Sequence, residues 1–253
     1  MYWLLTLVWF FLILLPILSI FGAFSQADLI AGLRSPLVRE ALRVSALSTG
    51  ISMVLILSLG LPTAYFLARS NWRGKVFLDT LLDLPMVLPP AVAGMALLLA
   101  FGRRGLAGEV LYKMGLVLPF SLPAVVMAQT FVAAPFFIRS AKSGFQAVDK
   151  NLEWAAQTLG KTPWQVFWRV TFPLALPSLV SGLIMSWARA LGEFGATLIF
   201  AGNMPGRTQT LPLAVYSAME TDFPAAMVMS AFLVVISFLV LVSVKVLAGK
   251  GLG

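Results

Sequence analysis

The sequence predicts an all-α polytopic membrane protein with about six transmembrane helices. Of its 253 residues, 60% are apolar and only 11% are charged, and the mean hydropathy is +0.94. Because a typical soluble domain carries roughly 25% charged residues, this chain cannot cover itself with a hydrated surface. Apolar segments of about 20 residues, the length that a helix needs to cross the hydrocarbon core, recur along the whole chain. The short alternating segments of a membrane β-barrel are absent.

Six spans are predicted in chain order. The first has no charged side chain, and we expect a retained helix because it lacks the basic start and small-residue cleavage pattern of a signal peptide. The second contains Gly60 and Pro62, and Pro85, Pro89 and Pro90 interrupt the third. The six predicted spans cover about residues 1–24, 41–68, 78–101, 122–138, 173–200 and 224–247.

The even number of spans places both termini on one side of the membrane. The loops on that side, with the chain end at Lys245 and Lys250, hold ten basic residues, and the opposite loops hold seven. Because cytoplasmic loops carry an excess of Lys and Arg, this difference favours cytoplasmic termini and a cytoplasmic segment 139–169. We therefore expect one transmembrane domain over residues 1–253, in a multi-pass protein of the cell membrane.

The composition also excludes several kinds of chemistry. The chain has no Cys and no His, so it lacks thiolate nucleophiles, the usual metal ligand and the usual general base. We predict no catalytic residues, no metal site and no cofactor. The net charge of +8 is assigned to the cytoplasmic loops, because no soluble basic module for nucleic acid is present.

One polar segment, residues 139–169, separates the fourth and fifth spans. Asp149 is a cap candidate for a short helix over 152–159, Gly160 predicts its end, and Pro163 predicts the start of another segment. Such a helix either lies on the lipid headgroups or is gripped by another protein, and composition alone does not decide between these. Its predicted apolar face consists of Leu152, Ala155, Ala156 and Leu159.

The same segment contains a false phosphate-binding motif. Residues 155–162, AAQTLGKT, fit a relaxed form of the phosphate-binding loop, in which Ala155 replaces the first Gly. That loop needs a buried strand before it and a helix after it, whereas here a predicted helix precedes it and Pro163 follows directly. We therefore predict that this chain does not bind ATP.

Residues 153–173 carry a family resemblance. Glu153 to Gly160, nine further residues and the block Val170-Thr171-Phe172-Pro173 closely resemble the EAA motif of ABC importer permeases. Trp154 stands in the motif's Glu position, with Glu153 one residue earlier. Val170 and Phe172 replace the motif's Ile and Leu.

Two further blocks are similar to molybdate permeases. The first is WARALGEFGAT at 187–197, which is followed by FAGNMPGRTQTLP at 200–212; the second is DLPMVLPPAVAG at 83–94. The sulfate permeases are close relatives with a similar block around residues 188–195. The resemblance extends from about residue 39 to residue 229.

The resemblance implies the type I ABC importer permease fold, and it implies partners. These are a second permease copy in a homodimer, two cytoplasmic ABC ATPase subunits, and an extracytoplasmic binding protein for molybdate or tungstate. The permease itself is then not an enzyme, since the ATPase subunits hydrolyse ATP. The short helix would be a coupling helix seated in an ATPase cleft, and its expected coupling residues are Glu153, Ala155, Ala156, Leu159, Gly160 and Pro163.

Three of the charged residues inside the predicted spans are candidates for a functional site. Arg189 and Glu193 are four residues apart and share a helix face, so they form either a structural pair or an element of the translocation pathway or gate. Asp83 either caps a local turn or acts in gating. Other pathway candidates are Ser186 and Thr197. Two lines of small residues, 182/186/190 and 188/192/196, predict close helix approach.

Two other function classes remain open at this level. A secondary transporter or channel would favour paired broken helices and inverted repeats, and neither is evident. A membrane enzyme would need a cluster of titratable groups, which is also lacking. Within the ABC class, sulfate and thiosulfate are the main alternatives to molybdate as substrate. This chain does not decide between them, because we expect specificity to reside in the binding protein.

Overall fold

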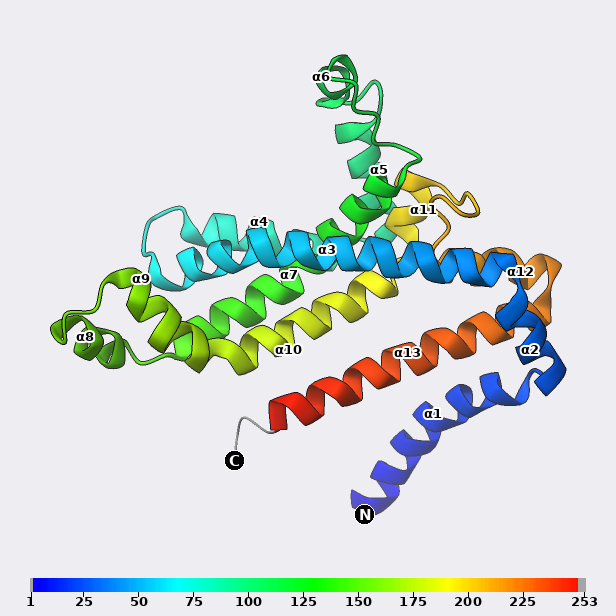
Figure 1. The fold of residues 1–253 in the computed structure, drawn as a ribbon, viewed down its shortest axis with the longest axis horizontal. Coiled ribbons are helices and arrows are strands. Elements are labelled where there is room, and N and C mark those ends of the chain that lie inside the picture. Colours follow the sequence, from blue (N-terminus) through cyan, green and yellow to red (C-terminus); the bar gives the residue numbers. More distant parts are fainter. Residues whose placement is uncertain (1, 250–253) are drawn as a thin grey trace.

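A computed structural model describes residues 2–249, and all its regular elements are helices (Figure 1). Met1 and residues 250–253, which include the predicted flanking residue Lys250, lie outside the described residues. The long helices are α1 (Tyr2–Gly22), α3 (Pro36–Arg69), α7 (Leu122–Ala147), α10 (Phe172–Leu191) and α13 (Phe223–Gly249). The shorter elements are α2 (Gln26–Arg34), α4 (Lys75–Val87), α5 (Pro90–Phe101), α6 (Gly108–Lys113), α8 (Lys150–Thr158), α9 (Pro163–Val166), the π-helix η1 (Phe167–Thr171), α11 (Gly195–Ala201) and α12 (Leu211–Thr221).

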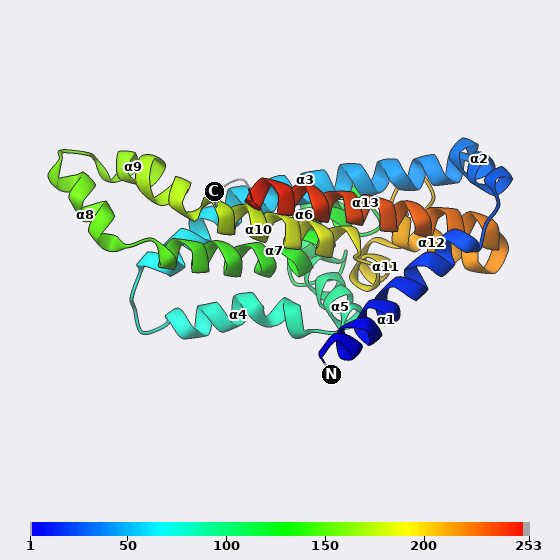
Figure 2. The same ribbon diagram turned by 90° about the horizontal axis from the view of Figure 1, so that it is seen from below.

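The prediction of about six membrane spans is confirmed. Within residues 2–249, five helical segments are long and apolar enough to cross a membrane, and a sixth span is obtained if the bent pair α4–α5 counts as one. Both terminal helices, α1 and α13, point their chain ends away from α2 and α12 (Figures 1 and 2). The cytoplasmic orientation of these ends stays a prediction.

The third span is interrupted, as its prolines predicted. The break falls at Pro89 and Pro90, whereas the predicted interruption at Pro85 is wrong, because α4 continues through it. The span consists of α4 and α5, which meet at an angle of 117°. Leu88 between them is extended, with φ −64° and ψ 132°, because the residue before a proline is pushed out of the helical region. Neither Pro89 nor Pro90 has an N–H to continue the helical ladder.

The fifth predicted span, 173–200, is also broken. Helix α10 ends at Leu191, and α11 begins at Gly195. Two glycines, Gly192 and Gly195, flank the break, and Glu193 supplies a side-chain cap to the new helix, as described below. Two broken spans are therefore present. The prolines indicated the break in the third span, whereas the break in the fifth was not predicted.

Helix α7 is the centre of the bundle and packs along α3 and α10 (Figure 1). Its buried residues Ala133, Phe137, Ala141 and Phe145 join a core with residues of α3 and α10. Toward the other end, α7 packs with α5 and α11, while α3 packs with α12 and α13. Helix α1 stands apart from this core, since none of residues Leu5–Gly22 is buried by the described residues.

Small residues allow α7 and α10 to approach closely. A Cβ added to Gly182 would lie 2.6 Å from the Cβ of Ser140, and one added to Gly144 would lie 2.5 Å from the Cβ of Ser178. The Ser140 hydroxyl donates a hydrogen bond to the Ser178 carbonyl at 2.7 Å. The predicted close approach along 182/186/190 is confirmed, because these three positions are buried. The line 188/192/196 was wrong, since α10 ends at Leu191 and Gly192 is exposed.

Replacing Gly182 with Val is expected to lower the thermal stability and folded yield of the detergent-solubilised protein. The new side chain has no room against Ser140, and overpacking of this kind costs about 1–3 kcal/mol. The matched control is Gly50→Val on α3, where an added Cβ meets nothing within 4 Å. Equal stability of the two variants would contradict the tight crossing.

Candidate functional site

Helix α8 lies at one far end of the molecule, joined to α7 and α9 by loops (Figures 1 and 2). The Asp149 carboxylate accepts a hydrogen bond from the Asn151 N–H at 2.9 Å and caps its start. At its end Gly160 adopts φ +78°, and the N–H groups of Gly160 and Lys161 donate to the carbonyls of Gln157 and Ala156. This is a Schellman motif, which favours Gly because its φ is positive. The predicted helix stop at Gly160 is confirmed.

The next helix also begins where the sequence predicted. Thr162 caps α9, its hydroxyl accepting from the Gln165 N–H while the Gln165 side chain accepts from the Thr162 N–H. Pro163 occupies the first helical position, where its missing N–H costs nothing. The sequence did not indicate the π-helix η1, which continues α9 toward α10.

The apolar side chains of α8 have no cover within the described residues. No residue of this helix is buried, and Leu159 just beyond its end is 81% exposed. Leu152 and Trp154 are also exposed, as is Ala155, and Ala156 is half-buried. The helix is therefore a short, capped element with an apolar surface that is open to a partner or to a membrane.

Glu153 differs from the rest of α8, because it faces the bundle. Its Oε1 accepts hydrogen bonds from the Arg69 guanidinium and from the Thr171 hydroxyl, the latter at 2.6 Å. Arg69 ends α3, and Thr171 ends η1 just before α10. Glu153 thus links α8 to the end of α3 and to the end of η1. It makes these contacts although Trp154 holds the motif's usual Glu position. The sequence did not reveal Arg69 or Thr171 as partners.

Arg189 and Glu193 form a direct ion pair, Nη1 to Oε2, at 2.7 Å. Glu193 is 1% exposed, and its Oε1 accepts a hydrogen bond from the Ala196 N–H at 2.7 Å. One carboxylate therefore caps α11 and neutralises Arg189. The arginine side chain keeps 28% of its surface exposed, so only the acidic member of the pair is sealed.

The two breaks in the spans contact each other. A Cβ on Gly195 would lie 2.7 Å from the Cβ of Pro90, and one on Gly94 would lie 2.8 Å from the carbonyl oxygen of Ala196. The start of α11 thus rests on the start of α5, and only glycine leaves room for this contact. This contact makes the Arg189–Glu193 pair part of a junction between two discontinuous spans.

The sequence left open whether Asp83 caps a local turn or acts in gating, and in the structure it does not cap a turn. It lies within α4, and its Oδ1 is 3.5 Å from the Nε of Arg139 on α7. One turn earlier, Asp79 pairs with Lys142. These two ion pairs join α4 to α7, and neither was predicted from the sequence.

Ser186 and Thr197 are fully buried in this structure. The Ser186 hydroxyl donates to the Ala133 carbonyl at 2.8 Å and so pairs α10 with α7. Thr197 lies within α11. Their place in a pathway stays a prediction. Among the residues that the structure describes, no group of three or more His, Cys, Asp or Glu side chains is arranged to hold a metal ion.

Apolar spans, two discontinuous helices that meet, and an exposed capped helix at one end define a membrane permease with the type I ABC importer fold. The chain belongs to the family of binding-protein-dependent transport system inner membrane components, whose profile matches residues 60–250. It is a multi-pass protein of the inner membrane. Membership of this family sets aside the secondary transporter and the membrane enzyme.

Curated relatives support the same family. The molybdenum transport system permease protein ModB of Mycobacterium tuberculosis is 48% identical over 202 residues, which cover 80% of this chain and 76% of that protein. ModB of Escherichia coli K12 is 40% identical over 183 residues, 72% of this chain and 80% of that protein. The sulfate transport system permease protein CysW of Synechococcus elongatus is 39% identical over 183 residues, 72% of this chain and 64% of that protein.

Among solved structures, the fold is similar to that of a bacterial ABC transporter involved in the import of the acidic polysaccharide alginate. The TM-score is 0.78 at 15% identity, and the match covers 98% of this chain and 94% of that chain. At this identity the likeness concerns the fold alone.

Replacing Arg189 with Ala is expected to reduce folded yield more than the double change Arg189→Ala with Glu193→Gln. The single change leaves a buried carboxylate without its counter-charge, at a cost of about 3–5 kcal/mol. Gln removes the charge and keeps an oxygen that accepts from Ala196. A double-mutant cycle on folded yield measures this coupling.

The control cycle uses Arg139→Ala and Asp83→Asn, a pair that is longer and more exposed. Exposed pairs contribute about 0–1 kcal/mol, so these two changes are expected to be nearly additive. Additive effects at Arg189 and Glu193 would show that the ion pair does not stabilise the junction.

Proposed function

We propose that this chain is the membrane-spanning permease subunit of an ATP-driven importer that carries molybdate, and also tungstate, into the cytoplasm. The observation that carries the proposal is the similarity to ModB proteins over most of the chain. Molybdate and tungstate are tetrahedral dianions of nearly equal size, so one permease serves both. Sulfate is the second candidate, because the CysW relative is also similar over 72% of this chain.

In this proposal, α8 is the coupling helix. The exposed side chains of Ala155 and Leu159, together with the half-buried Ala156, enter a cleft of a cytoplasmic ABC ATPase subunit. The caps at Gly160 and Pro163 hold the helix in one shape as the cleft moves. Glu153 transmits that movement, since it joins α8 to Arg69 on α3 and to Thr171 before α10.

The complete importer contains two copies of this permease, two ATPase subunits and an outer binding protein for the anion. Two copies supply two coupling helices, one for each ATPase subunit. The cytoplasmic termini of the permease follow from the same arrangement, because α8 then faces the cytoplasm. ATP hydrolysis takes place on the partners.

The gate is proposed at the junction of the two broken spans. A movement of α10 changes its break at Gly192 and thereby shifts α11 against the start of α5. Arg189 and Glu193 lie at that break, Asp83 lies on α4 before the other bend, and Ser186 and Thr197 lie on the helices that move. Arg189 offers the anion a partly exposed positive charge, while Glu193 keeps that charge balanced when no anion is present.

Transport in proteoliposomes tests the substrate. The permease is reconstituted with its ATPase subunits and binding protein, and ATP-driven uptake of molybdate is measured with tungstate or sulfate as competitor. We expect molybdate uptake to depend on ATP. Tungstate is expected to suppress this uptake, whereas a tenfold excess of sulfate is not. If sulfate is taken up and molybdate is neither transported nor able to compete, the proposed substrate is wrong. The assignment as an ABC permease would still hold.

A further inference from the structure

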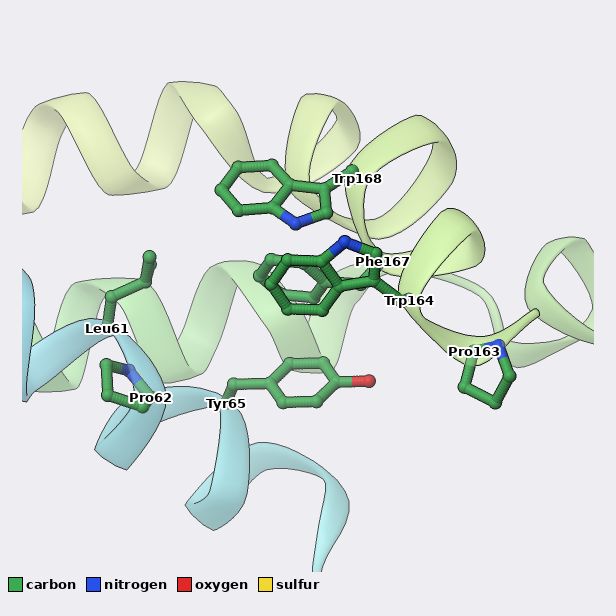
Figure 3. A pocket seen from close by; sticks show the side chains of 7 residues that line it. All are labelled: Leu61, Pro62, Tyr65, Pro163, Trp164, Phe167 and Trp168. Atoms are coloured by element: carbon green, nitrogen blue, oxygen red, sulfur yellow. The ribbon is translucent and has the colours of Figure 1, made fainter.

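An apolar pocket of about 400 Å³ lies between α3 and the α9–η1 segment (Figure 3). Tyr65 of α3 forms one wall, and Trp164, Phe167 and Trp168 form the other. Within this aromatic group the Tyr65 and Phe167 rings meet edge to face with their centroids 4.9 Å apart, and the Trp164 and Phe167 rings stack with their centroids 6.3 Å apart. Trp164 and Trp168 are 69% and 45% exposed, so large aromatic surface remains open at the pocket.

The pocket continues as a groove along the membrane-spanning helices. A second apolar cavity of about 500 Å³ runs between α3 and α10 and shares Leu61 and Trp168 with the first. Its other lining residues include Leu57, Phe172 and Leu176. Together the two cavities form a long apolar groove on the surface of the spans, with aromatic rings at one end.

Two basic residues are close in the chain to residues that line the aromatic end of the groove. Lys161 and Arg169 flank the pocket residues 163–168 in the sequence, and both side chains are exposed. Neither is in an ion pair with any of the described residues, whereas nearby Arg69 is paired with Glu153. Tryptophan and tyrosine at the edge of a span mark the headgroup level, and basic residues there attract anionic lipid.

We propose that an anionic phospholipid of the inner leaflet binds this groove. One acyl chain lies between α3 and α10, the aromatic pocket holds the glycerol end of that chain, and the phosphate is near Lys161 and Arg169. An apolar groove that is open to the bilayer, ends in interfacial aromatic rings and is flanked by unpaired cations matches each part of such a lipid. The ATPase would bind the exposed side of α8, whereas the groove runs between α3 and α10. The two surfaces meet at Pro163, which lines the pocket.

Native mass spectrometry of the full chain, purified with its partner subunits, tests the headgroup contact. Phosphatidylglycerol and phosphatidylcholine are titrated against wild type and against the double variant Lys161→Gln with Arg169→Gln. Two lost headgroup contacts of about 1 kcal/mol each correspond to phosphatidylglycerol affinity about 30-fold lower in the variant. The loss for phosphatidylcholine is expected to be smaller, because its choline cation already balances the phosphate charge.

The matched control is Arg104→Gln with Lys113→Gln, which removes one Arg and one Lys from the exposed loop around α6. It is expected to bind phosphatidylglycerol as wild type does. An equal loss in both double variants would mean that only net charge matters, and an unchanged affinity in both would show no such contact. Either result overturns the proposal, and neither bears on whether the protein transports molybdate.

Fluorescence quenching tests the acyl position. Phosphatidylglycerol with brominated acyl chains is expected to quench wild-type tryptophan fluorescence more than brominated phosphatidylcholine does. The excess is expected to disappear in Trp164→Phe with Trp168→Phe and to persist in Trp72→Phe, which lies outside the pocket. An excess that is absent in wild type, or that survives the double change, would contradict the site. A groove covered by α1 of a second permease copy would give the first of these results.

Discussion

The close approach of α7 to α3 and α10 is the constraint on which the other features depend. Burial of apolar surface gives no net drive between helices in lipid, so packing and interhelical hydrogen bonds must hold the bundle together. Gly144 and Gly182 allow this contact, and the hydroxyls of Ser140 and Ser186 donate across it. A rigid three-helix core then leaves α4, α5 and α11 as the broken elements around it.

Three acidic side chains inside the spans are paired with basic ones. Asp79 and Asp83 of α4 form ion pairs with Lys142 and Arg139 of α7, and Glu193 pairs with Arg189. Glu193 has the further role of capping α11, which lets a span break inside an apolar segment without an unpaired amide at Ala196. Glu153 plays a parallel part at the end of the molecule, where it connects α8 to two helices. Glu153 contacts Thr171 just before α10, and Glu193 lies just after the end of α10, so the two glutamates are near opposite ends of that helix.

Local features were predictable from the sequence, and contacts between distant residues were not. The spans followed from apolar length, and Gly160 and Pro163 gave the ends of the two short helices because caps depend on neighbouring residues. The prolines at 89 and 90 indicated the bend between α4 and α5, but the contact of α5 with α11 was not predictable from the sequence. The partners of Glu153 were hidden, since Arg69 lies 84 residues earlier in the chain. The pair of Arg189 and Glu193 was predictable from its spacing, whereas the cap on Ala196 required knowing that the helix ends at Leu191.

Cross-linking from α8 tests most directly whether this segment couples the permease to an ATPase. The chain has no Cys, so a single cysteine at Leu159, which is 81% exposed, and another at Leu106, which is 95% exposed on the loop before α6, report on one site each. The account predicts that the cysteine at 159 cross-links to the ATPase subunit in membranes, with a yield that changes when ATP is added, and that the cysteine at 106 does not. A cysteine at 159 that reacts with an impermeant reagent from outside intact cells, and never cross-links to the ATPase, would contradict both the coupling role of α8 and the orientation of the chain.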